Sequence, residues 1–264
     1  MTDRFARLAA ALLIVGPLAA PLAAQSVELA PGTMKYRLTG ATKGTQTTPA
    51  GSQDFEVGVL QQITVNLAKT SKDTVKATMT LDSIDVKSQQ GGPDLSKLKG
   101  ANFTAMLSPT GKVYSAKGPD GLDPMLSQVV DGVTRILPTF RSNLVKGFSW
   151  SDTSKTKLNQ QGMDVERTTV TKFTVAGDTT VAGQKAFKVD KVTSIKAGGM
   201  GSMGGTSLTM ESEGSSIGAF FITPAGVYLG SRASDSLNTK MSVVGQNYEV
   251  VIKQSGTTNV EPIK

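Results

Sequence analysis

The residue types on which most catalytic sites depend are missing from this chain of 264 amino acids, which contains no histidine and no cysteine. Serine–histidine–aspartate and cysteine–histidine mechanisms are therefore excluded, as are thiolate and imidazole ligands for zinc. An enzyme without them needs a carboxylate pair, a lysine nucleophile or a bound cofactor. The tightest acidic cluster, Glu211 and Glu213, lies in a Ser/Gly-rich stretch and is typical of a strand end.

One short motif has the spacing of a known nucleophile. Ser154 and Lys157 are separated like the serine–lysine pair of some acyl transferases. That chemistry needs the serine at the start of a helix inside a pocket, whereas residues 151–161 are polar apart from Leu158. The glycine-rich segment 198–205 lacks the Lys-Ser/Thr pair of a phosphate loop. We therefore expect no catalytic residues, no enzymatic activity and no cofactor.

The same glycine-rich segment contains Met200 and Met203, and thioethers bind Cu(I). Two methionines are too few for a tight copper site, and the surrounding glycines favour a flexible loop. We expect a loop without a metal.

The first 24 residues have the layout of a cleavable signal peptide. Arg4 and Arg7 precede an unbroken apolar run at 8–15, and small residues follow before the polar pair Gln25-Ser26. The apolar run is too short for a transmembrane helix. We expect a protein exported to the periplasm or the extracellular space of a bacterium; an uncleaved anchor helix is the alternative.

Cleavage after Ala24 would leave 264 − 24 = 240 residues, and the loss of Arg4, Arg7 and Asp3 would change the net charge from +7 to +6. Without cysteine, the stability of an exported domain must come from its core. The lysines are scattered singly and aromatic residues are few, so we expect no nucleic-acid partner. The basic surface either contacts acidic lipid headgroups, as a peripheral membrane protein would, or simply keeps the protein soluble.

Alternating apolar residues predict β-strands along most of the mature chain. The polar link 70–73 between two such runs predicts a hairpin. The second run changes phase at Asp82-Ser83, which predicts a β-bulge there. One face of the clearest run consists of Phe55, Val57, Val59, Gln61, Ile63, Val65 and Leu67.

A single amphipathic helix is predicted over 123–137. Asp123 can cap it, Pro124 fits its first turn and Pro138 stops it. Its apolar face must be buried, and the concave side of a curved sheet is the obvious place.

The chain also reads as two related halves on either side of this helix. Residues 107–111 (Leu-Ser-Pro-Thr-Gly) match residues 222–226 (Ile-Thr-Pro-Ala-Gly) without a gap, at a separation of 115. We therefore expect a signal peptide at 1–24, a β half at 25–118, a helix and connector at 119–146, and a second β half at 147–264. The predicted fold is all-β: a curved antiparallel sheet or open barrel built from two related halves, or alternatively two separate sandwiches.

Two segments carry a resemblance to known proteins. Residues 177–189 (GDTTVAGQKAFKV) resemble a hairpin common in exported bacterial envelope proteins, and Lys146–Trp150 resembles the motif that opens the second half of an uncharacterised family of such proteins. The layout is similar to the lipoprotein-carrier superfamily, which implies a curved sheet around an apolar cavity plugged by helices. The chain departs from carriers in having one predicted helix where they have several, and no ligand-contact residue matches by position.

The function expected from these features is non-catalytic binding of a lipid or an acylated ligand on the concave face of the sheet. The alternative is a structural or interaction protein of the cell envelope, with a filled core and a protein partner. The expected ligand-binding residues, which ordinary core packing would also explain, are Met79, Met106, Met125, Val129, Val133 and Met210.

Overall fold

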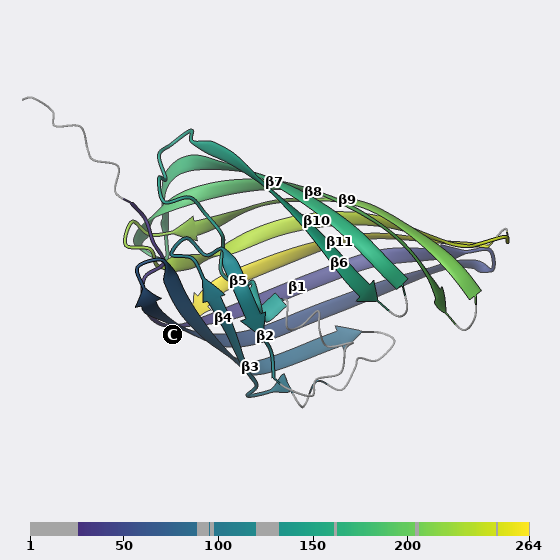
Figure 1. The fold of residues 1–264 in the computed structure, drawn as a ribbon, viewed down its shortest axis with the longest axis horizontal. Coiled ribbons are helices and arrows are strands. Elements are labelled where there is room, and N and C mark those ends of the chain that lie inside the picture. The colour runs from purple at the N-terminus through teal and green to yellow at the C-terminus, as the bar shows by residue number, and fades with distance from the viewer. Residues whose placement is uncertain are drawn as a thin grey trace, which may run out of the picture.

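In the computed structural model the described residues are 26–88, 95, 98–119, 132–160, 163–203, 206–246 and 248–263. Within these ranges eleven strands form a single antiparallel sheet (Figure 1). The strands are β1 (Gly32–Thr48), β2 (Gly51–Ser71), β3 (Thr74–Ser88), β4 (Asn102–Leu107), β5 (Val113–Lys117), β6 (Ser149–Gln160), β7 (Met163–Val181), β8 (Gln184–Met203), β9 (Thr206–Ile222), β10 (Tyr228–Val243) and β11 (Glu249–Ile263).

The strand order is β5-β4-β3-β2-β1-β11-β10-β9-β8-β7-β6, so the first strand pairs with the last in the middle of the sheet. Lys35 lies opposite Ile263 in that ladder, and Thr47 lies opposite Val251. The segment between β5 and β6, here called the connector, takes the chain from one edge of the sheet to the other. Because β5 and β6 are not paired, the sheet is open, as predicted, and it is one sheet rather than two sandwiches.

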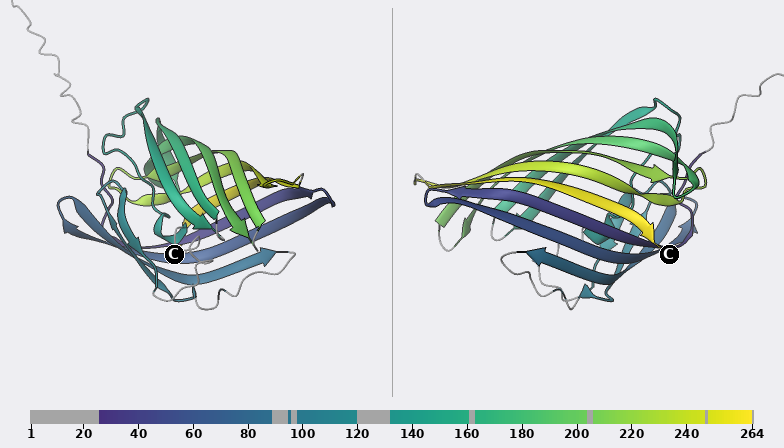
Figure 2. Two further views of the ribbon diagram at one scale, coloured as in Figure 1. Left: turned by 45° about the vertical axis from the view of Figure 1, so that its right-hand side comes forward. Right: turned by 180° about the vertical axis from the view of Figure 1, so that it is seen from behind.

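The sheet is strongly curved, so that β6–β9 arch over β2–β4 (Figures 1 and 2). At the end that we call the tip, the hairpins β1–β2, β6–β7, β8–β9 and β10–β11 turn back. At the opposite end, the base, β2 turns into β3, β4 into β5, β7 into β8 and β9 into β10. Side chains alternate between an inner, concave face and an outer, convex face along every strand.

The predicted bulge and hairpin are both present in the β2–β3 ladder. Gln62 pairs with Ser83 and Ile63 pairs with Leu81, which leaves Asp82 as the extra residue. The Thr64 hydroxyl donates a hydrogen bond of 2.6 Å to the Asp82 carboxylate. The bulge keeps apolar side chains on the inner face although the sequence pattern changes phase.

The prediction of a loop at 198–205 is wrong for residues 198–203, which belong to β8. Gly199 pairs with Val165 on one side and with Met210 on the other, so the segment is hydrogen-bonded to two neighbouring strands. Ladder bonds on both sides compensate for the low strand propensity of glycine.

Most of the predicted helix lies outside the described residues, because 120–131 are not described. Residues 132–134 are helical, and the helix ends there rather than at residue 137. Pro138 disfavours the helical conformation in Leu137, the residue before it, which accounts for the exclusion of that residue from the helix. The predicted signal peptide also lies outside the described residues.

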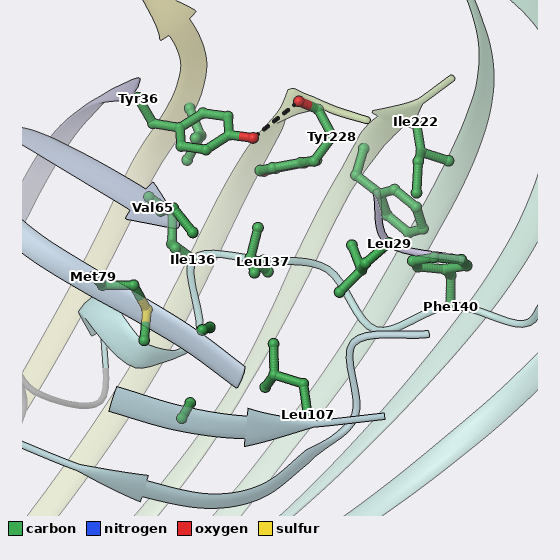
Figure 3. Close-up of a cluster of buried hydrophobic side chains, with 14 of the residues drawn as sticks. Leu29, Tyr36, Val65, Met79, Leu107, Ile136, Leu137, Phe140, Ile222 and Tyr228 are labelled. Carbon is green, nitrogen blue, oxygen red and sulfur yellow. Dashed lines mark hydrogen bonds between the residues drawn. The ribbon is translucent and has the colours of Figure 1, made fainter. Parts of the chain in front are cut away.

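The main core fills the base between the two arms of the sheet (Figure 3). Tyr36 and Ile63 come from the first half of the chain and Phe220 and Ile222 from the second, and each is at most 3% exposed. The Tyr36 hydroxyl donates a hydrogen bond of 3.1 Å to the Tyr228 carbonyl, which also joins the halves. From the connector, the core receives Val133, Ile136, Leu137, Phe140 and Leu144.

The two matching Pro-Gly segments form the same turn at the base, which supports the interpretation of an internal repeat. In each, the glycine amide donates to the carbonyl three residues earlier, and both glycines have positive φ, 81° at Gly111 and 85° at Gly226. Each turn also bonds a neighbouring segment, since the Leu29 amide donates to the Pro109 carbonyl and the Ala30 amide donates to the Gly226 carbonyl.

Candidate binding site on the inner face

The inner face of the tip half carries apolar side chains that are incompletely covered, with polar residues and glycines between them. Most of its apolar side chains are half-buried rather than buried, unlike those of the base core, although Met163 and Val165 at the tip end of β7 are buried. Thr, Ser and Gln residues lie between them, and the described charged side chains on this face include Arg167 and Asp235. The half-buried apolar residues are Phe55, Val57, Val59, Ile195, Met210, Leu237, Met241 and Ile252.

The outer face of the tip half carries the charges. Cross-strand ion pairs join Lys43 to Glu56 at 3.4 Å and Lys240 to Glu249 at 2.6 Å. Lys196 and Glu213 form another at 3.2 Å, and the side chains of both are more than 70% exposed. These ion pairs lie on the outer face, which also carries the exposed apolar side chains of Val170, Val192 and Ile217.

The structure does not bring the catalytic candidates of the sequence together in a site. Ser154 and Lys157 lie three residues apart on a strand, and therefore on opposite faces of it. Lys157 bonds Glu166 at 2.9 Å on the outer face, and this bond raises the pKa of Lys157 and lowers the pKa of Glu166. Glu211 and Glu213 both point outward beside lysines, so they face no shared cleft.

Large inner side chains lie over glycines of the neighbouring strand. A Cβ atom at Gly44 would lie 2.5 Å from the Phe55 ring, and one at Gly214 would lie 2.7 Å from Cδ1 of Leu237. These glycines let Phe55 and Leu237 lie flat along the inner face.

A polar belt separates the base core from the tip half. Lys191 follows the buried Val189 on the inner face of β8, and Thr193 comes next toward the tip. The Thr193 and Thr171 hydroxyls are 3.0 Å apart and hydrogen-bonded. Burial lowers the pKa of Lys191, and Asp235 opposes this change.

A cavity of about 240 Å³ lies between this belt and the connector. Arg135 and the segment 136–139 line one wall, and Lys191, Thr171 and Thr193 line the other with neighbouring core residues. Sequence reasoning missed this site. The available signal was Lys191 itself, a charged residue at a position where the alternation of Phe187 and Val189 requires an apolar one.

The methionine and valine residues predicted to bind the ligand lie in different parts of the structure where they are described. Met79 and Val133 are fully buried in the base core. Met210 lies half-buried on the inner face of the tip half, whereas Met106 alternates with the inward-facing Phe103, Ala105 and Leu107 and therefore points outward. Met125 and Val129 lie outside the described residues. Of the four that the structure describes, only Met210 lies on the surface described above.

Of the two methionines considered and set aside as copper ligands, Met200 alone has a described side chain. Met200 is 72% exposed on the outer face. In the described part of the chain, no three acidic side chains gather in a way that would hold a metal ion.

The larger hollows lie elsewhere. Those of about 710 and 530 Å³ are lined mostly by outer-face residues, among them Lys43, Glu56 and Arg232, and the larger is also lined by Phe55 and Leu237. A smaller one of about 210 Å³ lies at the base beside Met34 and Tyr36. Among the described residues, no helix has the length and apolar character needed to cross a membrane.

Comparisons with known proteins give no family. No family model matches the sequence, and a search against curated proteins finds no match. Among solved structures, Neisserial surface protein A matches with a TM-score of 0.17 and 10% identity over 86% of this chain and 97% of that chain.

Two other solved structures give similar values. A Vibrio parahaemolyticus domain, provisionally described as an outer membrane lipoprotein-sorting protein, matches with a TM-score of 0.19 and 10% identity over 86% of this chain and 83% of that chain. A Nitrosomonas europaea protein, provisionally described as AttH, has a TM-score of 0.18 and 8% identity over 84% of this chain and 91% of that chain. Scores this low carry no argument about function.

Proposed function

We propose that this protein is a non-catalytic binding protein that holds an apolar or acylated ligand along the inner face of the tip half. One observation carries the proposal: the half-buried apolar side chains of the tip half face the concavity, while its ion pairs lie on the outer face. Apolar surface that remains accessible on a concave face gains free energy when a ligand covers it, about 25 cal/mol per Å².

A specific observation also favours a second candidate, a structural or interaction protein of the envelope. The base core is filled, and its cavities of about 210 and 240 Å³ lie below the about 300–1,000 Å³ of small-molecule pockets. On this view the inner face of the tip half receives a partner protein rather than a lipid.

The proposed function includes a location outside the cytoplasm. The signal-peptide layout of residues 1–24 would export the chain, and the periplasm or the extracellular space would supply acylated ligands. The basic net charge would favour peripheral contact with anionic lipid surfaces.

The first test is native mass spectrometry with lipid extraction on mature protein purified from its own envelope fraction. A stoichiometric co-purifying lipid or acylated molecule would support the binding function and identify the ligand class. A clean mass of the protein alone, with no lipid in the extract, would favour the interaction protein.

A pair of adjacent substitutions then locates the ligand. Ile252 points inward and is half-buried, whereas Lys253 is exposed on the outer face of the same strand. Ile252→Asn should weaken ligand retention by about tenfold, because a buried amide replaces apolar contact surface, and Lys253→Asn should leave it unchanged. Equal retention by both variants would place the ligand elsewhere.

A further inference from the structure

The cavity beneath the connector combines two features that the base core and the tip half do not share. It is lined by both cationic and hydroxyl side chains, from Lys191, Arg135, Thr171, Thr193 and Ser231, with Phe173 at its apolar side. It also lies where the apolar core ends and the open inner face begins, because Val189 precedes Lys191 along β8 and Ile195 follows.

Lys191 is the central feature of this cavity. Its side chain is half-buried, and among the described residues its ammonium forms no ion pair or hydrogen bond. Asp235 is near enough to favour the charged form, yet burial outweighs it and lowers the pKa of Lys191. A cation that is partly removed from water, with Asp235 nearby but no hydrogen bond or ion pair to it, is costly, and an anion bound beside it would offset that cost.

The threonine pair supplies a further donor. Thr171 and Thr193 bond each other, which uses one of their two hydroxyl hydrogens. The other hydrogen has no acceptor among the described residues. The two hydroxyls and Lys191 line one cavity, so an oxyanion placed in it can accept from an ammonium and a hydroxyl together.

The size of the cavity fits one polar group rather than a whole ligand. Its volume of about 240 Å³ exceeds the roughly 30 Å³ of one water molecule in the liquid. It falls below the about 300 Å³ at which small-molecule pockets begin. An apolar chain would have to continue outside it, along Ile195, Leu237 and Ile252 toward the tip.

We propose that the Lys191 cavity binds the anionic group of an amphiphile whose apolar chain lies along the inner face of the tip half. This inference rests on the proposed function and adds to it the class of ligand, an anionic amphiphile rather than a neutral lipid. The anionic group is a carboxylate or a phosphate, since either oxyanion accepts from the ammonium of Lys191 and a hydroxyl.

The test compares three probes with one oleoyl chain on the full mature protein: oleate, oleoyl lysophosphatidate and neutral mono-oleoylglycerol. Affinities are measured by isothermal titration calorimetry for the wild type and for Lys191→Met, Lys191→Arg and the control Lys172→Met. Lys172 is exposed on the outer face of β7, beside the same row of the sheet. Thermal unfolding of each variant confirms that it folds.

Lys191→Met should lower the affinity for the anionic probe by about tenfold or more, as expected for the loss of a charged hydrogen bond. The affinity of Lys191→Met for the neutral probe should change by less than about twofold. Lys191→Arg should retain most of the affinity for the anionic probe, and Lys172→Met should bind every probe like the wild type. The probe that loses affinity, oleate or the lysophosphatidate, identifies the carboxylate or the phosphate as the group bound.

Two other outcomes would overturn the inference in different ways. If the neutral and anionic probes bind equally, and Lys191→Met affects their affinities alike, the protein binds apolar chains without recognising a headgroup. The proposed function then stands without this refinement. If none of the probes binds the wild type, the proposed function fails and the headgroup site fails with it.

Discussion

Lys191 occupies an inner position of β8 at which the alternation of the strand places apolar side chains. Val189 on one side is fully buried, and on the other side Thr193 is followed by the half-buried Ile195. The energetic consequence of a lysine at this point is measurable without any ligand, because its burial changes how the stability of the protein depends on pH.

Replacing Lys191 by Met should remove an alkaline gain in stability. Burial lowers the pKa of Lys191 below 10.5, so the charged form costs stability at neutral pH. This cost disappears as pH rises through the lowered pKa toward 10.5, where the unfolded chain still binds the proton. Urea unfolding should therefore show that the free energy of unfolding of the wild type rises relative to that of Lys191→Met over that pH interval. A constant difference would contradict the burial of the charge, and Lys172→Met serves as the exposed control.

Tyr36 links the two halves of the base core through one hydrogen bond. Tyr36→Phe should lower the free energy of unfolding by about 1–3 kcal/mol, because the Tyr228 carbonyl would lose a donor in a buried setting. Chemical denaturation of both proteins measures this. Tyr114→Phe, at a side chain that is 57% exposed, should change nothing. Similar stabilities for Tyr36→Phe and wild type would mean that water replaces the hydroxyl.

At the scale of elements, local chemistry predicted some features and long-range pairing decided others. The phase change at Asp82 and the Pro-Gly turns depend on neighbouring residues, so they could be recognised in the sequence and are confirmed. The glycine-rich segment 198–203 was predicted as a loop because its own propensity favours one. It is a strand because β7 and β9 bond it from both sides, and such partners are not visible in a local window.

The Pro-Gly turns should be sensitive to an added methyl group to an extent that backbone strain alone does not explain. A Cβ atom at Gly226 would lie 1.6 Å from the Glu28 carbonyl oxygen, and one at Gly111 would lie 2.0 Å from that of Pro138. Gly183 has a similar positive φ of 78° but nothing within 4 Å. Gly183→Ala should cost about 1–2 kcal/mol, the strain of a left-handed residue. Gly226→Ala and Gly111→Ala should each cost more.

Thermal and urea unfolding of the three glycine variants distinguish the two contributions. Equal losses in all three would show that only the backbone conformation matters. Larger losses in the two Pro-Gly turns would show that they clamp the N-terminal segment and the connector against the base.

At the scale of the whole molecule, the halves recognised in the sequence share one sheet and one core. The alternation of apolar residues predicted the antiparallel strands, and the repeated turns predicted the two halves, but neither pattern by itself predicts the curvature of the sheet. Two further features did not follow: the pairing of β1 with β11, and the meeting of Lys191 with the connector. Both join residues more than fifty positions apart, and no local pattern encodes such contacts. The four described residues that were predicted to bind a ligand lie in different parts of the sheet and connector for the same reason.

The shared core predicts that neither half is stable alone. Residues 26–118 and 119–264, expressed separately, should each lack a cooperative unfolding transition, because Tyr36 and Ile63 would lose contact with Phe220, Ile222 and Tyr228. Mixed or coexpressed, the two fragments should associate through the β1–β11 ladder and the base core, and cooperative unfolding should return. Size-exclusion chromatography and circular dichroism measure both effects. Independent cooperative folding of either fragment would contradict a shared core, since a half that folds alone must bury its own inner face without the other half.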